Sequence, residues 1–219
     1  QVIYNEKGEP LQMQYYYKEG ASESKFNGGD VIYEDVNHDG QINNLDIMYL
    51  GNSLPKLTGG FGITLRYGHW RLSSQFNYRV NIDVFSASRL DMERMDNTYN
   101  QSQAVNYRWR KEGDLTTIPR ALNGSEGRSF NALLSDRYIE DASFLRLNYL
   151  QLSYTFDSKL VKKWHMNALR LNASANNLFC LTKFTGLDPE VGYGGYGVAT
   201  SSGQTPRSKQ WTFSATIEF

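Results

Sequence analysis

The last nine residues of the chain constrain its fold most, because their side chains alternate between apolar and polar without interruption. The apolar members of this segment are Trp211, Phe213, Ala215, Ile217 and Phe219. Successive side chains of a β-strand point to opposite faces, so this spacing predicts a strand with one apolar and one polar face. Such a strand suits a soluble β-sandwich and equally a membrane β-barrel, which meets lipid outside and water inside.

Two neighbouring segments earlier in the chain show the same alternation. Residues 57–67 and 70–80 each place aromatic and aliphatic side chains on one face and threonine, serine or arginine on the other. Only Gly68 and His69 separate the two segments. Two alternating runs across a minimal turn predict a β-hairpin.

Three further strands are expected, with less regular patterns. Residues 144–156 alternate with a change of phase at Tyr149-Leu150, where a β-bulge would restore the pattern. Residues 169–179 alternate cleanly, whereas residues 12–18 form a weaker candidate that follows a turn at residues 5–10. With the hairpin and the terminal segment, the chain is therefore expected to contain about six strands.

The connections between these strands alternate in length. The short or moderate ones are residues 5–10, 68–69 and 157–167, and the long ones are residues 19–56, 81–143 and 182–209. Long polar connections are uncommon in compact soluble domains. Short turns at one end of a sheet and long loops at the other are typical of a transmembrane barrel, so this regularity favours the barrel.

In a barrel, the apolar faces would meet lipid and the polar faces would line the lumen, because a charge on the lipid face costs about 2–4 kcal/mol at the bilayer centre. The arginines expected in the lumen are Arg66, Arg71, Arg79 and Arg170. Tyr67, Trp70 and Trp211 fall at strand ends, where interfacial aromatic residues belong, although ordinary packing would also account for them.

Composition excludes several classes of protein. The 23 basic and 23 acidic residues balance, so no bulk field attracts nucleic acid. The single cysteine, Cys180, permits no internal disulfide, and the three histidines are not spaced for zinc. No Gly-x-Ser-x-Gly elbow is present, and we expect no enzyme. The low apolar content of 40%, with 15 Tyr, suits a barrel with aromatic girdles, although a sugar-binding β-sandwich shares this bias.

The richest motif for chemistry is the twelve-residue segment 35–46, which has the spacing of an EF-hand calcium loop. The expected ligands are Asp35, Asn37, Asp39, Gln41 through its main-chain carbonyl, and Asp46. Gly40 stands where the loop turns sharply, and Ile42 stands at the usual apolar position. Because only one copy is present, calcium would pin an external loop. The alternative is an Asx-turn loop that needs no metal.

Aromatic residues in the expected outer loops are candidates for substrate or partner contacts. These residues are Tyr107, Trp109, Tyr193 and Tyr196. Aromatic rings can stack on sugars. Packing of the loop on a partner would explain the same residues equally well.

Several segments, in the same order along the chain, resemble the C-terminal barrel region of TonB-dependent outer-membrane transporters of the SusC/RagA type. They are residues 29–42, 50–61, 135–147, 176–179, 182–190 and the terminal strand. Where the family often has glycine, this chain has His38. The resemblance implies an all-β fold, with residues 1–219 forming the C-terminal strands, roughly the last quarter, of an antiparallel transmembrane barrel of about 22 strands. The remainder of the barrel and the N-terminal plug would come from other sequence, and residues 35–46 would lie in a long extracellular loop.

The resemblance also implies a function and partners. It implies import of oligosaccharides or peptides across the cell outer membrane, powered through TonB, with a SusD-type surface lipoprotein as partner and outer-membrane lipid around the barrel. Trp211, Phe213 and Phe219 would belong to a terminal barrel-assembly signal. The alternatives are a soluble carbohydrate-binding β-domain stabilised by calcium, and a passive porin or a barrel-embedded hydrolase.

Overall fold

The computed structural model describes most of the chain in two compact units. The described residues are 16–19, 22–122, 130–190 and 198–219. The first unit comprises Gln1–Leu50 and Ala87–Tyr138, and the second comprises Gly51–Ser86 and Ile139–Phe219. The turn expected at residues 5–10 lies outside the described residues.

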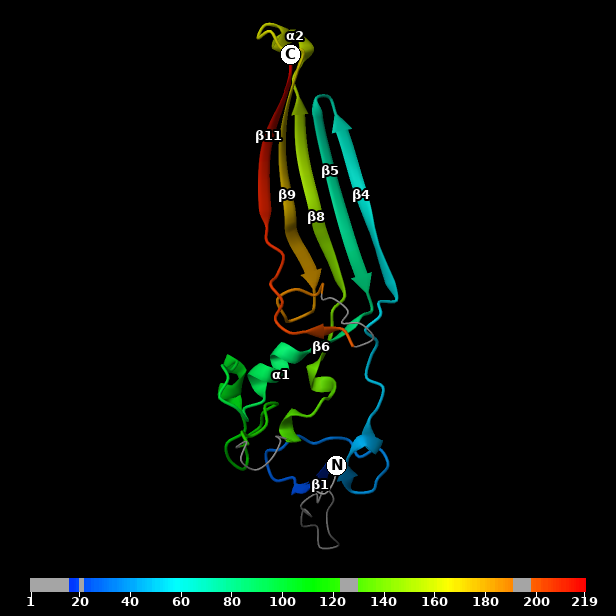
Figure 1. Ribbon diagram of the computed structural model, residues 1–219, viewed down its shortest axis with the longest axis vertical. Coiled ribbons are helices and arrows are strands. Elements are labelled where there is room, and N and C mark those ends of the chain that lie inside the picture. The colour runs from blue at the N-terminus through cyan, green and yellow to red at the C-terminus, as the bar shows by residue number, and fades with distance from the viewer. Residues whose placement is uncertain (1–15, 20–21, 123–129, 191–197) are drawn as a thin grey trace. The chain divides into compact units, whose positions relative to one another are not determined.

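The second unit is built on a five-stranded antiparallel sheet in the order β11-β9-β8-β5-β4 (Figure 1). Its strands are β4 (Leu57–Tyr67), β5 (Trp70–Val80), β8 (Phe144–Thr155), β9 (Ala168–Thr182) and β11 (Gln210–Glu218). These bounds confirm the expected strands, with β9 running further toward Thr182 than its alternation predicts. The all-β fold class is confirmed.

The register of the five strands brings most of their apolar positions onto one face, with Phe144 and Tyr149 of β8 on the polar face. Trp70 lies opposite Tyr154, Tyr154 opposite Leu171, and Leu171 opposite Ala215. The phase change in β8 is accommodated at Asn148, which has no register partner on either neighbouring strand. The predicted bulge is therefore present, one residue before the expected position. It restores the alternation, so the apolar face continues across the whole sheet.

The short connections lie together at one end of this sheet (Figure 1). Gly68 turns the β4–β5 hairpin with a φ of 56°, a left-handed conformation that glycine adopts without strain. The connection from β8 to β9 contains the helix α2 (Ser158–Lys162) and lies at the same end as the C-terminus. The chain after β5 and β9 leaves from the opposite end, as the alternation of connection lengths predicts.

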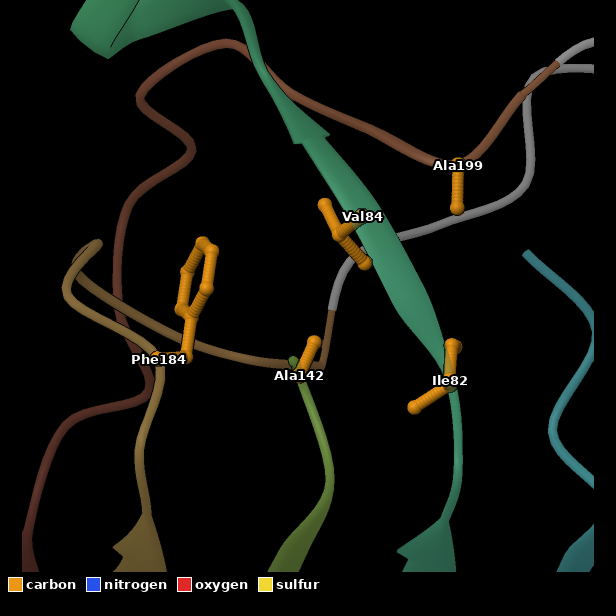
Figure 2. Close-up of a cluster of buried hydrophobic side chains, with 5 residues drawn as sticks. All are labelled: Ile82, Val84, Ala142, Phe184 and Ala199. Atoms are coloured by element: carbon orange, nitrogen blue, oxygen red, sulfur yellow. The ribbon is translucent and has the colours of Figure 1, made fainter. Parts of the chain in front are cut away.

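Parts of the long connections pack into a small core at that opposite end. The strands β6 (Asp83–Ser86), β7 (Ile139–Asp141) and β10 (Thr200–Ser201) form a three-stranded sheet. The cluster in Figure 2 consists of Ile82, Val84, Ala142, Phe184 and Ala199. The expectation of plain polar loops is wrong here, because four separate segments each supply one or two apolar side chains, and no single segment shows a periodic pattern.

The first unit consists of short elements. Its described strands are β1 (Tyr16–Glu19), β2 (Ser22–Lys25) and β3 (Gln41–Ile42), which form a sheet in the order β2-β1-β3. Its described helical elements are η1 (Asn44–Asp46), α1 (Ala87–Glu93), η2 (Gln103–Tyr107), η4 (Phe130–Ala132) and η5 (Asp136–Tyr138).

This arrangement corrects the expected strand at residues 12–18. Of those residues, the structure describes 16–18, within β1, which pairs with β2 and β3 and does not join the five-stranded sheet. The described barrel-type strands therefore number five, where about six were expected.

None of the helices in the described part of the chain is long and apolar enough to cross a membrane.

Candidate functional surfaces

The polar face of the five-stranded sheet carries hydrogen-bonded side chains that run from strand to strand. The Tyr149 hydroxyl donates to Gln151 Oε1 at 2.7 Å, and Gln151 Nε2 donates to Asn172 Oδ1 at 3.3 Å. Asn172 Nδ2 in turn donates to Ser214 Oγ at 3.3 Å. These contacts span three neighbouring strands, so this face can accommodate water or a polar ligand along its width.

The four arginines expected in the lumen all lie on this polar face. Arg66 and Arg71 face each other in the register of β4 and β5, and both are exposed. Like charges directly opposite each other are destabilising, so this end of the face favours a bound anion or an acidic neighbour. Arg79 lies 5.9 Å from the centre of the Phe144 ring, and Arg170 Nε donates to Thr155 Oγ1 at 3.3 Å. Their role in lining a lumen stays a prediction.

A charged cluster that we did not predict from the sequence joins β8 to the segment after β9. Arg146 NH2 lies 2.5 Å from Asp188 Oδ1, and Arg146 Nε lies 3.5 Å from Glu190 Oε2. Arg207 NH2 pairs with Glu190 Oε1 at 2.9 Å, and its amide donates to Asp188 Oδ2 at 3.3 Å. The Arg146 side chain is only 5% exposed. No sequence signal distinguishes Arg146 from Arg66, Arg71 or Arg170, because each of these arginines stands between apolar neighbours on an alternating strand.

The pKa of the Asp188 carboxyl lies below its ordinary value. Burial pushes this pKa upward, but the amides of Glu190 and Arg207 and the Arg146 guanidinium outweigh burial. Because the folded-state pKa lies below the unfolded one, the ionised carboxylate stabilises the fold at neutral pH. That contribution is lost as the pH falls through the folded-state pKa, below about 3.9.

We therefore expect residues 182–190 to lose protection when the pH falls below about 3.9. The measurement is amide exchange in the full-length protein, corrected for intrinsic rates. The Asp188→Asn variant should have lower protection at pH 7 and little further loss in acid. An unchanged acid transition in that variant would assign the transition to another carboxylate.

The segment 35–46 forms a loop closed by its own side chains. Both oxygens of the buried Asp35 carboxylate accept main-chain hydrogen bonds, from the amide of Asp39 at 3.2 Å and that of Gly40 at 2.8 Å. Asp46 Oδ1 accepts from the Val36 amide at 3.0 Å, so the twelfth position of the loop is bonded to the second. Gly40 has a φ of 79°, and Ile42 is buried, as the motif predicts.

This loop shows the Asx-type hydrogen bonds of the metal-free alternative, and its donor set also fits a hard cation. A carboxylate oxygen has two lone pairs, so accepting an amide leaves capacity for a metal. Among the described residues, no three histidine, cysteine or acidic side chains gather into a metal-binding group. Calcium binding by Asp35, Asn37, Asp39, Gln41 and Asp46 therefore stays a prediction.

Calorimetric titration of calcium into the full-length protein tests that prediction. We expect a dissociation constant of about 0.1–1 mM, the range of extracellular calcium modules, and loss of the heat in Asp39→Ala. Asp91→Ala, outside the loop, is the matched control and should bind as the wild type does. Equal heats from the wild type and Asp39→Ala would remove the site.

Of the aromatic candidates, Tyr107 is 72% exposed and Trp109 is half-buried. The Trp109 indole packs on Gly29, where an added Cβ would lie 2.3 Å from the ring. Beside it, Arg120 Nε donates to Asp30 Oδ1 at 2.6 Å. The Trp109 ring therefore packs against the backbone at Gly28 and Gly29 within the first unit. Tyr193 and Tyr196 lie outside the described residues.

The substitution Gly29→Ala should destabilise the first unit by about 2–5 kcal/mol, because it adds left-handed strain and overpacking against Trp109. Gly113→Ala is the control, since Gly113 has a φ of 90° with nothing near its absent Cβ. It should show only the strain, about 1–2 kcal/mol. Amide exchange of residues 26–35 reports the difference, and equal effects of the two substitutions would contradict the packing role of Trp109.

The residues of the expected assembly signal are exposed at the edge strand. Trp211, Phe213 and Phe219 are 63%, 77% and 85% exposed. Trp211 and Phe213 lie on the apolar face, in register with Ala175 and Ala173. Their role in assembly stays a prediction.

A sheet that is apolar on one face and polar on the other, with its described short turns at one end, defines the wall of a transmembrane β-barrel.

No family model matches the chain. Three proteins of Formosa agariphila are similar in sequence. TonB-dependent receptor P39 is 32% identical over 169 residues, which are 75% of this chain and 16% of that receptor. TonB-dependent receptor P26 is 28% identical over 207 residues, which are 87% of this chain and 20% of that receptor. TonB-dependent receptor P3 is 25% identical over 165 residues, which are 75% of this chain and 16% of that receptor.

Solved structures agree with these relatives. The structure of the RagAB peptide transporter matches 82% of this chain and 19% of its own chain, with a TM-score of 0.69 and 25% identity. The RagAB peptide importer in the closed-closed state matches 99% of this chain and 20% of its own, with a TM-score of 0.66 and 22% identity, which supports the fold alone. The chain belongs with the TonB-dependent receptors of the SusC/RagA type, and it spans 16–20% of the length of these receptors.

Proposed function

We propose that this chain forms part of the barrel wall of a TonB-dependent importer in the outer membrane. Its five-stranded sheet would separate lipid from the lumen, while the energy of transport would reach the protein through TonB and parts of the protein beyond this chain. The importer would take up oligosaccharides or peptides together with a surface lipoprotein of the SusD type. The relatives carry the names of receptors and importers, and we expect no enzymatic activity.

One observation carries this proposal: the apolar face of the sheet is exposed along its length. The largest exposed side chains on it include Phe61 at 46%, Ile63 at 49%, Leu65 at 61%, Trp211 at 63% and Phe213 at 77%. A soluble β-domain would bury such a face, because large contiguous apolar patches are rare on soluble proteins. Strands of nine to fifteen residues are long enough to cross a bilayer when tilted.

The opposite face supports the proposed transport function, because its polar side chains and arginines can form hydrogen bonds with water and polar substrate in a lumen. The solved neighbours are a peptide transporter and a peptide importer, so a peptide is the first substrate class to test. A partner lipoprotein would contact the ends of the long connections, and calcium bound by residues 35–46 would fix one of them. The polar sheet face and the arginine pair Arg66–Arg71 suit a substrate that carries carboxylates.

The experiment is uptake of labelled peptides and oligosaccharides by cells with and without the full-length gene. We expect uptake to depend on the gene and on TonB, and to stop when the proton gradient is collapsed. Uptake that persists without the gradient would favour a passive porin. A full-length protein that stays soluble without detergent would contradict the whole proposal.

A further inference from the structure

The connection between β8 and β9 exposes large apolar side chains beside basic ones. Leu160 is 52% exposed and Trp164 is 59% exposed. They stand four residues apart on α2 and the helical turn that follows it, so they lie on the same side. Lys159, Lys162 and Lys163 accompany them and are also exposed. An exposed tryptophan at the tip of a connection has no role in the core of the fold.

This connection is held in one conformation by its caps. Asp157 accepts a hydrogen bond from the Lys159 amide at 2.8 Å, which begins the helix. His165, with a φ of 58°, ends the turn, and the amides of Trp164 and Met166 donate to the Val161 carbonyl at 2.9 and 3.2 Å. Val161 is fully buried. The exposure of Leu160 and Trp164 is therefore a fixed feature of the turn.

The turn lies just beyond a band of aromatic side chains on the apolar face. Tyr67, at the end of β4, is 86% exposed. Beside it, the Trp70 and Tyr154 rings have centroids 4.7 Å apart, and Tyr154 meets Phe156 at 4.9 Å. Aromatic belts of this kind lie at the interface between membrane and water. Figure 1 places α2 at the same end of the sheet as the β4–β5 turn, and hence at the level expected for lipid headgroups.

We propose that residues 157–167 lie in the headgroup layer of the leaflet at the short-turn end, which in outer-membrane barrels is the periplasmic end, and bind anionic phospholipid. Leu160 and Trp164 would enter the boundary between headgroups and acyl chains, and the three lysines would contact lipid phosphates. The inference rests on the outer-membrane placement proposed above.

The positive charge of this segment favours anionic phospholipid as the bound partner. Against Lys159, Lys162 and Lys163 the segment carries one acid, Asp157, whose carboxylate is engaged in capping the helix. Basic side chains around an exposed apolar pair are the pattern of an interfacial membrane segment. The apolar face of the sheet also leads directly to this turn.

Tryptophan fluorescence of the full-length protein in nanodiscs, with and without phosphatidylglycerol, tests the proposal. The difference between wild type and Trp164→Phe isolates the signal of Trp164, and Trp211→Phe isolates a reference residue on the apolar face. We expect Trp164 to be quenched by phospholipids brominated near the headgroup and to be protected from acrylamide. Replacing the three lysines with glutamine should reduce the bromolipid quenching about twofold, only in discs with phosphatidylglycerol.

Three results would overturn the inference. If acrylamide quenches Trp164 while bromolipid quenches Trp211, the turn faces water and the barrel placement stands. If neither agent reaches Trp164 while Trp211 still reports lipid, a protein covers the turn. If bromolipid quenches neither tryptophan, the membrane placement itself fails.

Discussion

Replacing Phe213 with arginine should prevent most of the full-length protein from accumulating as folded barrel. Phe213 is 77% exposed on the apolar face of β11, opposite Ala173. A charged residue on the lipid face costs about 2–4 kcal/mol near the bilayer centre. Heat-modifiable migration of the protein from outer-membrane fractions measures the folded amount, which we expect to fall several-fold.

The matched control is the neighbouring residue. Ser214→Arg places the same charge one residue along the strand, on the polar face, where Ser214 accepts a hydrogen bond from Asn172. Because successive side chains alternate between faces, this variant should keep near wild-type levels of folded protein. Equal losses in the two variants would contradict the assignment of faces.

Replacing Arg146 with alanine should release the segment that follows β9. Its guanidinium is the only buried cation described between Asp188 and Glu190, whose side chains are 11% and 14% exposed. Removing one partner of a buried ion pair costs about 3–5 kcal/mol, because the remaining charge is left without compensation. Amide exchange of residues 182–190 should accelerate roughly 100-fold or more at pH 7.

Arg170→Ala is the control for this effect. Arg170 is exposed and donates one long hydrogen bond to Thr155, so its removal should leave exchange in residues 182–190 unchanged. If Arg146→Ala also left exchange unchanged, Arg207 alone would be sufficient to hold Asp188 and Glu190.

The five long strands could be predicted from sequence because each carries its own period of two. The bulge at Asn148 was predicted to within one residue, because a change in the phase of the alternation on one strand is restored by one extra residue at that place. The positions of Arg66, Arg71, Arg79 and Arg170 on the polar face followed from the same alternation, whereas the buried ion pairs of Arg146 did not.

What could not be predicted depends on contacts between distant segments. The core of Figure 2 joins Ile82, Ala142 and Ala199, and none of these residues has a periodic neighbourhood. The sequence suggests Trp109 as a candidate for substrate contact. Its packing on Gly29 could not be predicted, because the two residues are 80 positions apart in the sequence. Local patterns define strands and faces, whereas the folding of long connections depends on long-range pairing.

The central claim is that the apolar face of the five-stranded sheet meets lipid while the polar face meets an aqueous lumen. Spin labels placed singly at residues 211–217 of the full-length protein, in a Cys180→Ser background and reconstituted in lipid, test it directly. We predict collisions with oxygen to peak at residues 211, 213, 215 and 217, and collisions with a water-soluble nickel complex to peak at 212, 214 and 216. Accessibility to both agents without a period of two, or with the opposite phase, would contradict the account.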